Sequence, residues 1–120
     1  MAAIALNTFK TIRKPISTSN VGIYTCPIGV ASIVILSQVT NISTGSGTST
    51  YTVTAYHSRS KEAPDSDYKF ANAVPIPPND SYNLVSDGRM ALETGDVIKI
   101  ESNENNALSL ILSVLETAKQ

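Results

Sequence analysis

The two residues of this 120-residue chain with the most versatile chemistry are a single histidine, His57, and a single cysteine, Cys26. A Ser-His-Asp site would use the histidine as general base, but the chain has no G-x-S-x-G motif to present a nucleophile. One histidine and one cysteine are too few for an ordinary zinc site. Apolar residues surround Cys26, so we expect a small buried side chain and no disulfide. The sequence predicts a protein that is not an enzyme and carries no cofactor or metal.

Carboxylates cluster in the stretch EAPDSDY, where Glu62, Asp65 and Asp67 lie within six positions. Calcium prefers oxygen-rich loops of this kind, but the stretch lacks the D-x-D-x-D-G spacing of an EF-hand. We interpret it as a solvated loop between strands. In the stretch LETGD, Gly95 can adopt a positive φ and Asp96 can hydrogen-bond the turn backbone, which indicates a tight turn.

Pro75 and Pro78 of PIPP (75–78) have P-x-x-P spacing, but these prolines lie between two strand-like segments. Proline cannot donate to a β-ladder, so these residues are expected to mark a strand end or a crossing between sheets. They do not indicate a proline-rich recognition motif, which usually lies in a disordered polar tract.

Basic residues gather in the stretch KTIRK (10–14), within a chain whose net charge is −1. No aromatic platform accompanies them, so we expect no nucleic-acid partner. The first sixty residues hold four basic residues and no acidic one, whereas the last sixty hold five basic and all ten acidic residues. Either the strands interleave and mix these charges in space, or the protein meets its neighbours through complementary faces.

A two-residue period dominates the chain and predicts the elements that must position these groups. Turn signals rich in Gly, Pro, Asn and Asp separate short β-prone segments at intervals of about eight to twelve residues. The prediction is an all-β fold: one domain over residues 1–120, an antiparallel β-sandwich, jelly-roll-like, with about eight strands. The segments expected as strands are 4–13, 21–25, 30–42, 49–59, 67–73, 81–85, 89–93, 97–102 and 107–117.

Residues 30–42 and 107–117 are the expected central strands. Both faces of the first are apolar in its middle, which predicts burial on two sides. Leucine and alanine make helix the competing prediction for the second, but its alternating serines favour a strand. The strand 49–59 should show threonine on its open face. The expected core comprises Ile33, Val34, Ile35, Leu36, Val53, Leu92, Ile98, Leu110, Ile111 and Leu112.

No membrane partner is expected. The beginning, MAAIALNTFK, lacks the basic n-region of a signal peptide. The longest apolar run, IGVASIVIL, is shorter than the ~20 residues that span a bilayer. We therefore expect a protein that is assembled in a cytoplasm.

Four motifs make the chain similar to small virion structural proteins of tailed bacteriophages, in particular of contractile-tailed phages of cyanobacteria. They are a T-C-P-x-G turn (Thr25–Gly29), a proline-bearing segment (Pro75–Pro78), an L-E-x-G-D turn (Leu92–Asp96) and a closing strand that ends in L-E (Leu115–Glu116). The resemblance extends from Val21 to Thr117. It implies a β-sandwich in the virion, assembled in the host cytoplasm, with major capsid or tail proteins as partners. It assigns no functional residues.

The low charge, the resemblance and the absence of catalytic motifs favour a structural role as a multi-copy capsid decoration or head–tail accessory protein, and we expect a homo-oligomer. Residues 1–14 form either a docking arm or the first strand of the sandwich. The alternative function is carbohydrate binding, in which some of the five tyrosines would stack on sugar rings; they are Tyr24, Tyr51, Tyr56, Tyr68 and Tyr82. The expected partner-binding residues are Ile4, Leu6, Phe9, Lys10, Ile12, Arg13 and Lys14.

Overall fold

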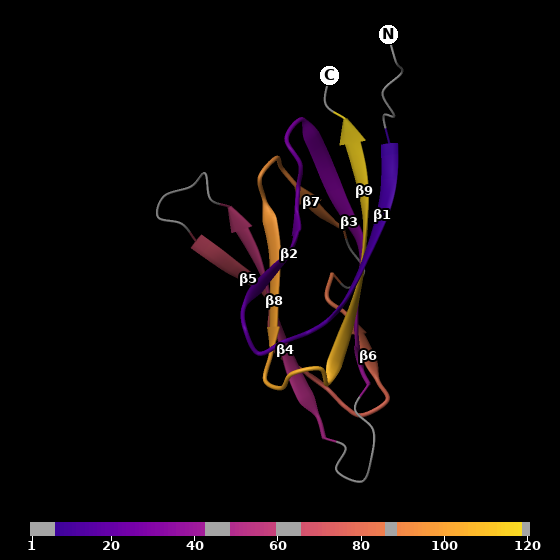
Figure 1. Ribbon diagram of the computed structural model, residues 1–120, viewed down its shortest axis with the longest axis vertical. Helices are drawn as coiled ribbons and strands as arrows, with labels where there is room; N and C mark the ends of the chain where they lie inside the picture. The colour runs from indigo at the N-terminus through magenta and orange to yellow at the C-terminus, as the bar shows by residue number, and fades with distance from the viewer. Residues whose placement is uncertain (1–6, 43–48, 60–65, 86–88, 119–120) are drawn as a thin grey trace.

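The protein is an all-β sandwich of two antiparallel sheets (Figure 1). The structure, a computed structural model, describes residues 7–42, 49–59, 66–85 and 89–118. Within these ranges there is no helix, and hence none that could cross a membrane. The strands are β1 (Asn7–Pro15), β2 (Val21–Thr25), β3 (Val30–Asn41), β4 (Tyr51–Arg59), β5 (Ser66–Ile76), β6 (Ser81–Asn83), β7 (Met90–Leu92), β8 (Val97–Ser102) and β9 (Leu108–Ala118).

The strand order is that of a jelly roll, as predicted. One sheet has the order β1-β9-β3-β6, with β7 also paired to β3, and the other has the order β2-β8-β4-β5. The chain therefore crosses repeatedly from one sheet to the other. The described residues form nine strands where about eight were expected, because β6 and β7 each pair with a separate part of β3.

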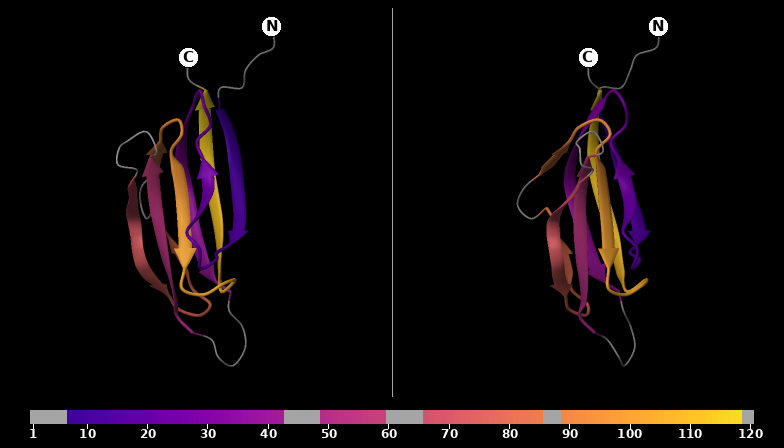
Figure 2. Two further views of the ribbon diagram at one scale, coloured as in Figure 1. Left: turned by 60° about the vertical axis from the view of Figure 1, so that its left-hand side comes forward. Right: turned by 90° about the vertical axis from the view of Figure 1, so that its left-hand side faces the viewer.

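The strand β9 lies between β1 and β3, which makes it central to the five-stranded sheet (Figures 1 and 2). The strand prediction for this segment is confirmed. All nine residues of β1 pair with β9 in an unbroken register, from Asn7 opposite Thr117 to Pro15 opposite Ser109. The Thr117 hydroxyl donates a hydrogen bond to Asn7 Oδ1 at 3.0 Å, so the beginning and the end of the described chain lie side by side.

The core fills the space between the sheets. Side chains at every second position of β9, from Leu108 to Val114, are at most 1% exposed. Of the ten residues predicted to be buried, the structure confirms Val34, Val53, Leu92, Ile98, Leu110 and Leu112.

The prediction was wrong for Ile33, Ile35 and Ile111, which are 36%, 37% and 44% exposed, and Leu36 is only partly buried. The reason is that a two-layer sandwich buries one face of each sheet, and no described element covers the other face of the five-stranded sheet. The pairing of β3 with β9 also shifts between Val34 and Leu36, which is the signature of a β-bulge at this point. The strand β3 is therefore not buried on two sides.

Several turn predictions are confirmed. Gly95 has φ 89°, and the Glu93 N–H donates to Asp96 Oδ2 at 2.9 Å. The strand β5 ends at Ile76, directly before Pro77, and Pro75 lies near its end on the sheet edge.

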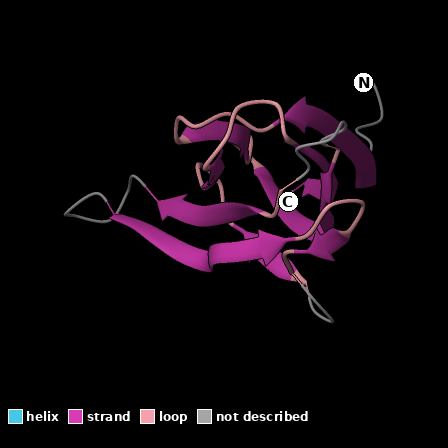
Figure 3. Cartoon of the chain, turned by 90° about the horizontal axis from the view of Figure 1, so that it is seen from below, coloured by secondary structure: helices cyan, strands magenta, loops and turns pink. Residues whose placement is uncertain are grey.

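The expected burial of Cys26 is also confirmed, since its side chain is 1% exposed. Figure 3 shows β4 and β5 as a hairpin that projects from the body of the sandwich.

Candidate assembly surface

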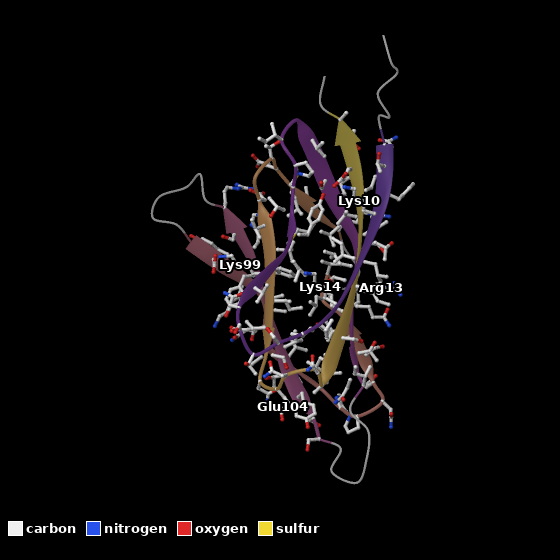
Figure 4. The ribbon with its side chains drawn as sticks, in the orientation of Figure 1. Lys10, Arg13, Lys14, Lys99 and Glu104 are labelled. Atoms are coloured by element: carbon white, nitrogen blue, oxygen red, sulfur yellow. The ribbon has the colours of Figure 1, made fainter. Side chains whose placement is uncertain are left out.

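The strand β1 forms one edge of the five-stranded sheet, and β9 is its single strand neighbour among the described residues. The strand β1 carries most of the residues predicted to bind a partner, among them Lys10, Arg13 and Lys14 (Figure 4). Phe9 is 72% exposed, Lys10, Arg13 and Lys14 are exposed, and Ile12 packs against the core. Ile4 and Leu6 lie outside the described residues. The structure brings the five described residues together on one strand, and whether they bind a partner stays a prediction.

Alternation divides the side chains of β1 between two faces. Phe9 and Arg13 lie opposite Leu115 and Ile111 of β9, whose side chains point away from the core. Lys10 and its even-numbered neighbours lie opposite buried residues of β9 and share the inner face. The strand therefore presents an aromatic ring and a guanidinium group outward, and ammonium groups toward the rim of the core.

A row of apolar side chains crosses the exposed face of the five-stranded sheet. Phe9 pairs with Leu115, Leu115 pairs with Ile33, and Ile33 pairs with Ala91, so that β1, β9, β3 and β7 each contribute one member. We call this exposed face the outer face. Its further exposed apolar residues are Ile35 and Ile111. Leu115 is half-buried and the other three members of the row are exposed. Contiguous apolar surface of this kind is typical of protein interaction sites.

A buried polar cluster anchors β1 and β2 to the end of β9. Glu116 Oε2 accepts a hydrogen bond from the Tyr24 hydroxyl at 2.6 Å, and Glu116 Oε1 lies 3.6 Å from Lys10 Nζ. Ser32 Oγ lies 2.7 Å from the Tyr24 hydroxyl and 3.2 Å from Cys26 Sγ. Burial and the bond to Glu116 raise the pKa of Tyr24, which therefore stays neutral. These groups satisfy one another, and Lys10 of β1 approaches the cluster from its exposed side.

A second buried cluster surrounds Asp96, which is 0% exposed. Its carboxylate accepts hydrogen bonds from Arg59 Nε at 2.9 Å and Arg59 Nη2 at 2.8 Å, and His57 Nε2 lies 2.9 Å from Oδ2. Burial alone would raise the pKa of Asp96, but the bonds from Arg59, from the Glu93 N–H and from His57 together hold it well below its usual range. The cluster ties the turn before β8 to β4.

Charges from the two halves of the sequence meet in both clusters. Lys10 approaches Glu116, and Arg59 approaches Asp96 and Glu93. For these pairs the structure supports the first interpretation of the charge asymmetry, in which the strands interleave and mix the charges. Strands from the first half of the sequence alternate in both sheets with strands from the second half.

An open depression of about 450 Å³ adjoins the end of β1. Arg13, Lys14 and Pro15 line it from β1, and Ile42 and residues 109–111 complete it. It joins the outer face at Ile111, which lies opposite Arg13 of β1.

Those of the remaining candidate residues that the structure describes do not assemble into a site. Asp67 pairs with Lys99 at 3.2 Å, while Glu62 and Asp65 lie outside the described residues. The described part of the chain holds no group of three His, Cys, Asp or Glu residues spaced for a metal ion. Among the tyrosines, Tyr24 is buried, and the two exposed rings, Tyr68 and Tyr82, lie on different sheets. This arrangement does not favour the carbohydrate-binding alternative.

Sequence reasoning missed the outer face, because it placed Ile33, Ile35 and Ile111 in the core. The apolar character of both faces of residues 30–42 was the available signal. In a sandwich of two layers such a strand leaves one apolar face uncovered, so the same pattern could have indicated an interaction surface.

No family model matches the chain, and no curated protein matches it in sequence. Similar folds occur among solved structures. A chain in the acid-stable capsid structure of the Helicobacter pylori bacteriophage KHP30 has a TM-score of 0.58 and 13% sequence identity, with 97% of this chain and 90% of that chain covered. A chain of the Bacillus endospore appendages, described as a novel family of disulfide-linked pili, has a TM-score of 0.49 and 12% identity, with 100% and 98% covered. The comparison thus gives a bacteriophage capsid chain of similar fold, from a Helicobacter phage and not from the cyanobacterial phages that the motifs resemble.

Proposed function

We propose that this chain is a non-enzymatic structural protein of a bacteriophage virion. It is present in many copies, as a capsid decoration protein or head–tail accessory component, and it acts by binding other virion proteins. The outer face carries this proposal, because Phe9, Leu115, Ile33 and Ala91 form a continuous apolar row on the side of the sheet that no other described strand covers.

The fold adds support of a general kind. Jelly rolls recur in viral capsid proteins, and a phage capsid chain shares this fold at 13% identity. Jelly rolls also occur in lectins, and a fold alone does not specify a function. The arrangement of exposed apolar side chains therefore carries more weight than the fold. The proposal gives His57 a structural role, as a partner of the buried carboxylate of Asp96.

The first experiment is quantitative mass spectrometry of purified particles of the phage that encodes the chain. We expect many copies per particle, and immunogold labelling would then distinguish a capsid from a tail position. A chain that is abundant in infected cells and absent from purified particles would refute the proposal.

The second experiment tests the outer face itself. The double variant Ile33→Thr/Ile111→Thr should fold but enter particles in much lower amounts, because both side chains are exposed. Tyr68→Ser is the matched control: Tyr68 is 69% exposed but lies on β5 of the other sheet. Equal incorporation of both variants would contradict the assignment of the outer face.

A further inference from the structure

Among the described strands, β1 offers the longest sheet edge with an unbroken register. Among the described edge strands, β2 contains a register shift, β6 and β7 have three residues each, and β5 contains register shifts, a positive φ at Ala73 and Pro75. The strand β1 runs for nine residues with an unbroken register. Edge strands of this length and regularity are templates for an additional strand.

Hydrogen-bond parity shows which backbone groups of β1 are available. Residues of an antiparallel pair alternate between those that bond to the partner strand and those that point away from it. The Ile16 N–H donates to the Leu108 carbonyl at 2.9 Å, which assigns the even-numbered residues of β1 to β9. The Ile42 N–H donates to the Ala107 carbonyl, also at 2.9 Å, so the odd-numbered residues of β9 face β3, which agrees with this parity. The backbone groups of Phe9, Thr11 and Arg13 therefore point to the free edge.

We infer that β1 pairs with β1 of a second copy of this chain, antiparallel about a two-fold axis at Thr11. This inference rests on the proposed function, since it names the first partner of the assembly surface. The pair would join two five-stranded sheets into one continuous sheet and would align the two outer faces. Such an isologous contact closes on itself, because each copy uses the same edge.

The register follows from chain length and charge. Centring on Thr11 is the one two-fold arrangement in which all nine residues of β1 are paired. On the outer face it places the Phe9 ring opposite the Arg13 guanidinium of the other copy, a cation–π arrangement that occurs twice by symmetry. On the inner face it places Lys10 opposite Ile12 and Lys14 opposite Thr8. No like charges lie directly opposite each other.

The two-fold registers centred one residue to either side of Thr11 are less favourable. Centring on Lys10 places two lysines directly opposite each other and leaves two residues of each strand unpaired. Centring on Ile12 places Lys10 opposite Lys14 at two points. Pro15, which has no N–H, lies opposite an odd-numbered residue in both arrangements, Asn7 in the Thr11 register and Phe9 in the Ile12 register, so the lysines distinguish them. The inward lysines, which commonly protect an edge from pairing, here select one register.

Sedimentation of the full chain tests this inference. We expect the mass to double from 12.8 kDa as the concentration rises. Thr11→Pro removes the N–H at the centre of the proposed pair and keeps the β9 ladder, because that N–H points away from β9. It should weaken dimerisation by at least about tenfold, since two backbone hydrogen bonds are lost. Thr11→Val keeps the N–H and should dimerise like the wild type. An unchanged melting curve for both variants shows that the fold is retained.

A disulfide experiment tests the register. Directly opposed residues of a hydrogen-bonded pair have Cα atoms about 5.5 Å apart, within disulfide range. Thr11→Cys should therefore cross-link to itself under mild oxidation, and Phe9→Cys should cross-link to Arg13→Cys in a mixture. Tyr68→Cys, which is exposed on β5, reports random collisions, and the native Cys26 is buried.

A monomer at concentrations up to about 1 mM, with Thr11→Cys no faster than Tyr68→Cys, would overturn the inference. If that monomer is still found in purified particles, the proposed function stands and the β1 edge binds a different virion protein. If the dimer forms but particles lack the chain, the proposed function fails and the pairing stands.

Discussion

The guanidinium of Arg59 binds the fully buried carboxylate of Asp96 through two nitrogens, at 2.9 and 2.8 Å. Bidentate pairs of this kind are strong because two charge-assisted bonds share one geometry. The residues are 37 positions apart, and His57 approaches the same carboxylate from the strand that carries Arg59. Asp96 is therefore the point at which the four-stranded sheet holds the turn before β8.

Asp96→Asn should destabilise the protein. It keeps the shape of the side chain but removes the charge that Arg59 and His57 face, so we expect a loss of about 2–3 kcal/mol in the free energy of unfolding. Urea denaturation measures it. Glu93→Gln is the control: the Glu93 side chain is 65% exposed although it also approaches Arg59, so its loss should stay below about 1 kcal/mol. Equal losses in the two variants would show that burial of Asp96 does not matter.

The contribution of Asp96 should depend on pH in one direction. Its pKa is lower in the folded protein than in the unfolded chain, where an aspartate has a pKa of about 3.9. Below about pH 4 the unfolded chain takes up the proton first, so the stabilisation is present above this pH and is lost as the pH falls further. The stability difference between wild type and Asp96→Asn should therefore shrink with acidification. A difference that stays constant down to pH 2 would contradict this account.

The exposure of the two sides of the five-stranded sheet predicts opposite results for two similar truncations. Leu110→Ala should cost about 2–5 kcal/mol, because Leu110 is 1% exposed between the sheets. Ile35→Ala should cost less than about 1 kcal/mol, because Ile35 is 37% exposed on the outer face. Both are measured as free energies of unfolding. A large loss of stability in Ile35→Ala would mean that the Ile35 side chain packs more tightly than its exposed fraction indicates.

Substitutions on the two opposite faces of β1 should also have different effects on folding and on incorporation. Phe9→Ser should change the free energy of unfolding by no more than about 0.5 kcal/mol, because Phe9 is 72% exposed, but it should reduce incorporation into particles. Ile12→Ser should destabilise the fold, because Ile12 packs against the core. Deleting residues 1–14 cannot separate partner binding from folding, because it also removes the strand that pairs with β9. Incorporation of Phe9→Ser at the wild-type level would remove this ring from the interface.

Local patterns predicted the strands and the inner face of β9. Alternating serines and leucines in residues 107–117 place Leu110 and Leu112 on one side of a strand, and the structure has them there. The turn at Gly95 and Asp96 followed from the conformational preferences of these two residues. Each inference used only neighbours in sequence.

What the sequence could not indicate depends on pairing across the fold. The burial of Asp96 requires Arg59 and His57, and the Tyr24 hydroxyl meets Glu116 across 92 positions. The exposure of Ile35 depends on the number of β-sheet layers and on a bulge in β3 that no Gly, Pro, Asn or Asp marks in the sequence. The candidate interface was therefore only half predicted: its strand was named, but the apolar face beside it was assigned to the core.

The hydrogen bond between Thr117 and Asn7 joins residues 110 positions apart. Almost the entire chain must be closed into a loop before β1 can join β9, and non-local pairings of this kind are typical of slowly folding proteins. The edge offered to a partner would thus be completed late, after β9 has found β3. A circular permutant that connects the end of β9 directly to β1 turns this long closure into a local hairpin, and the same sheet should then form faster.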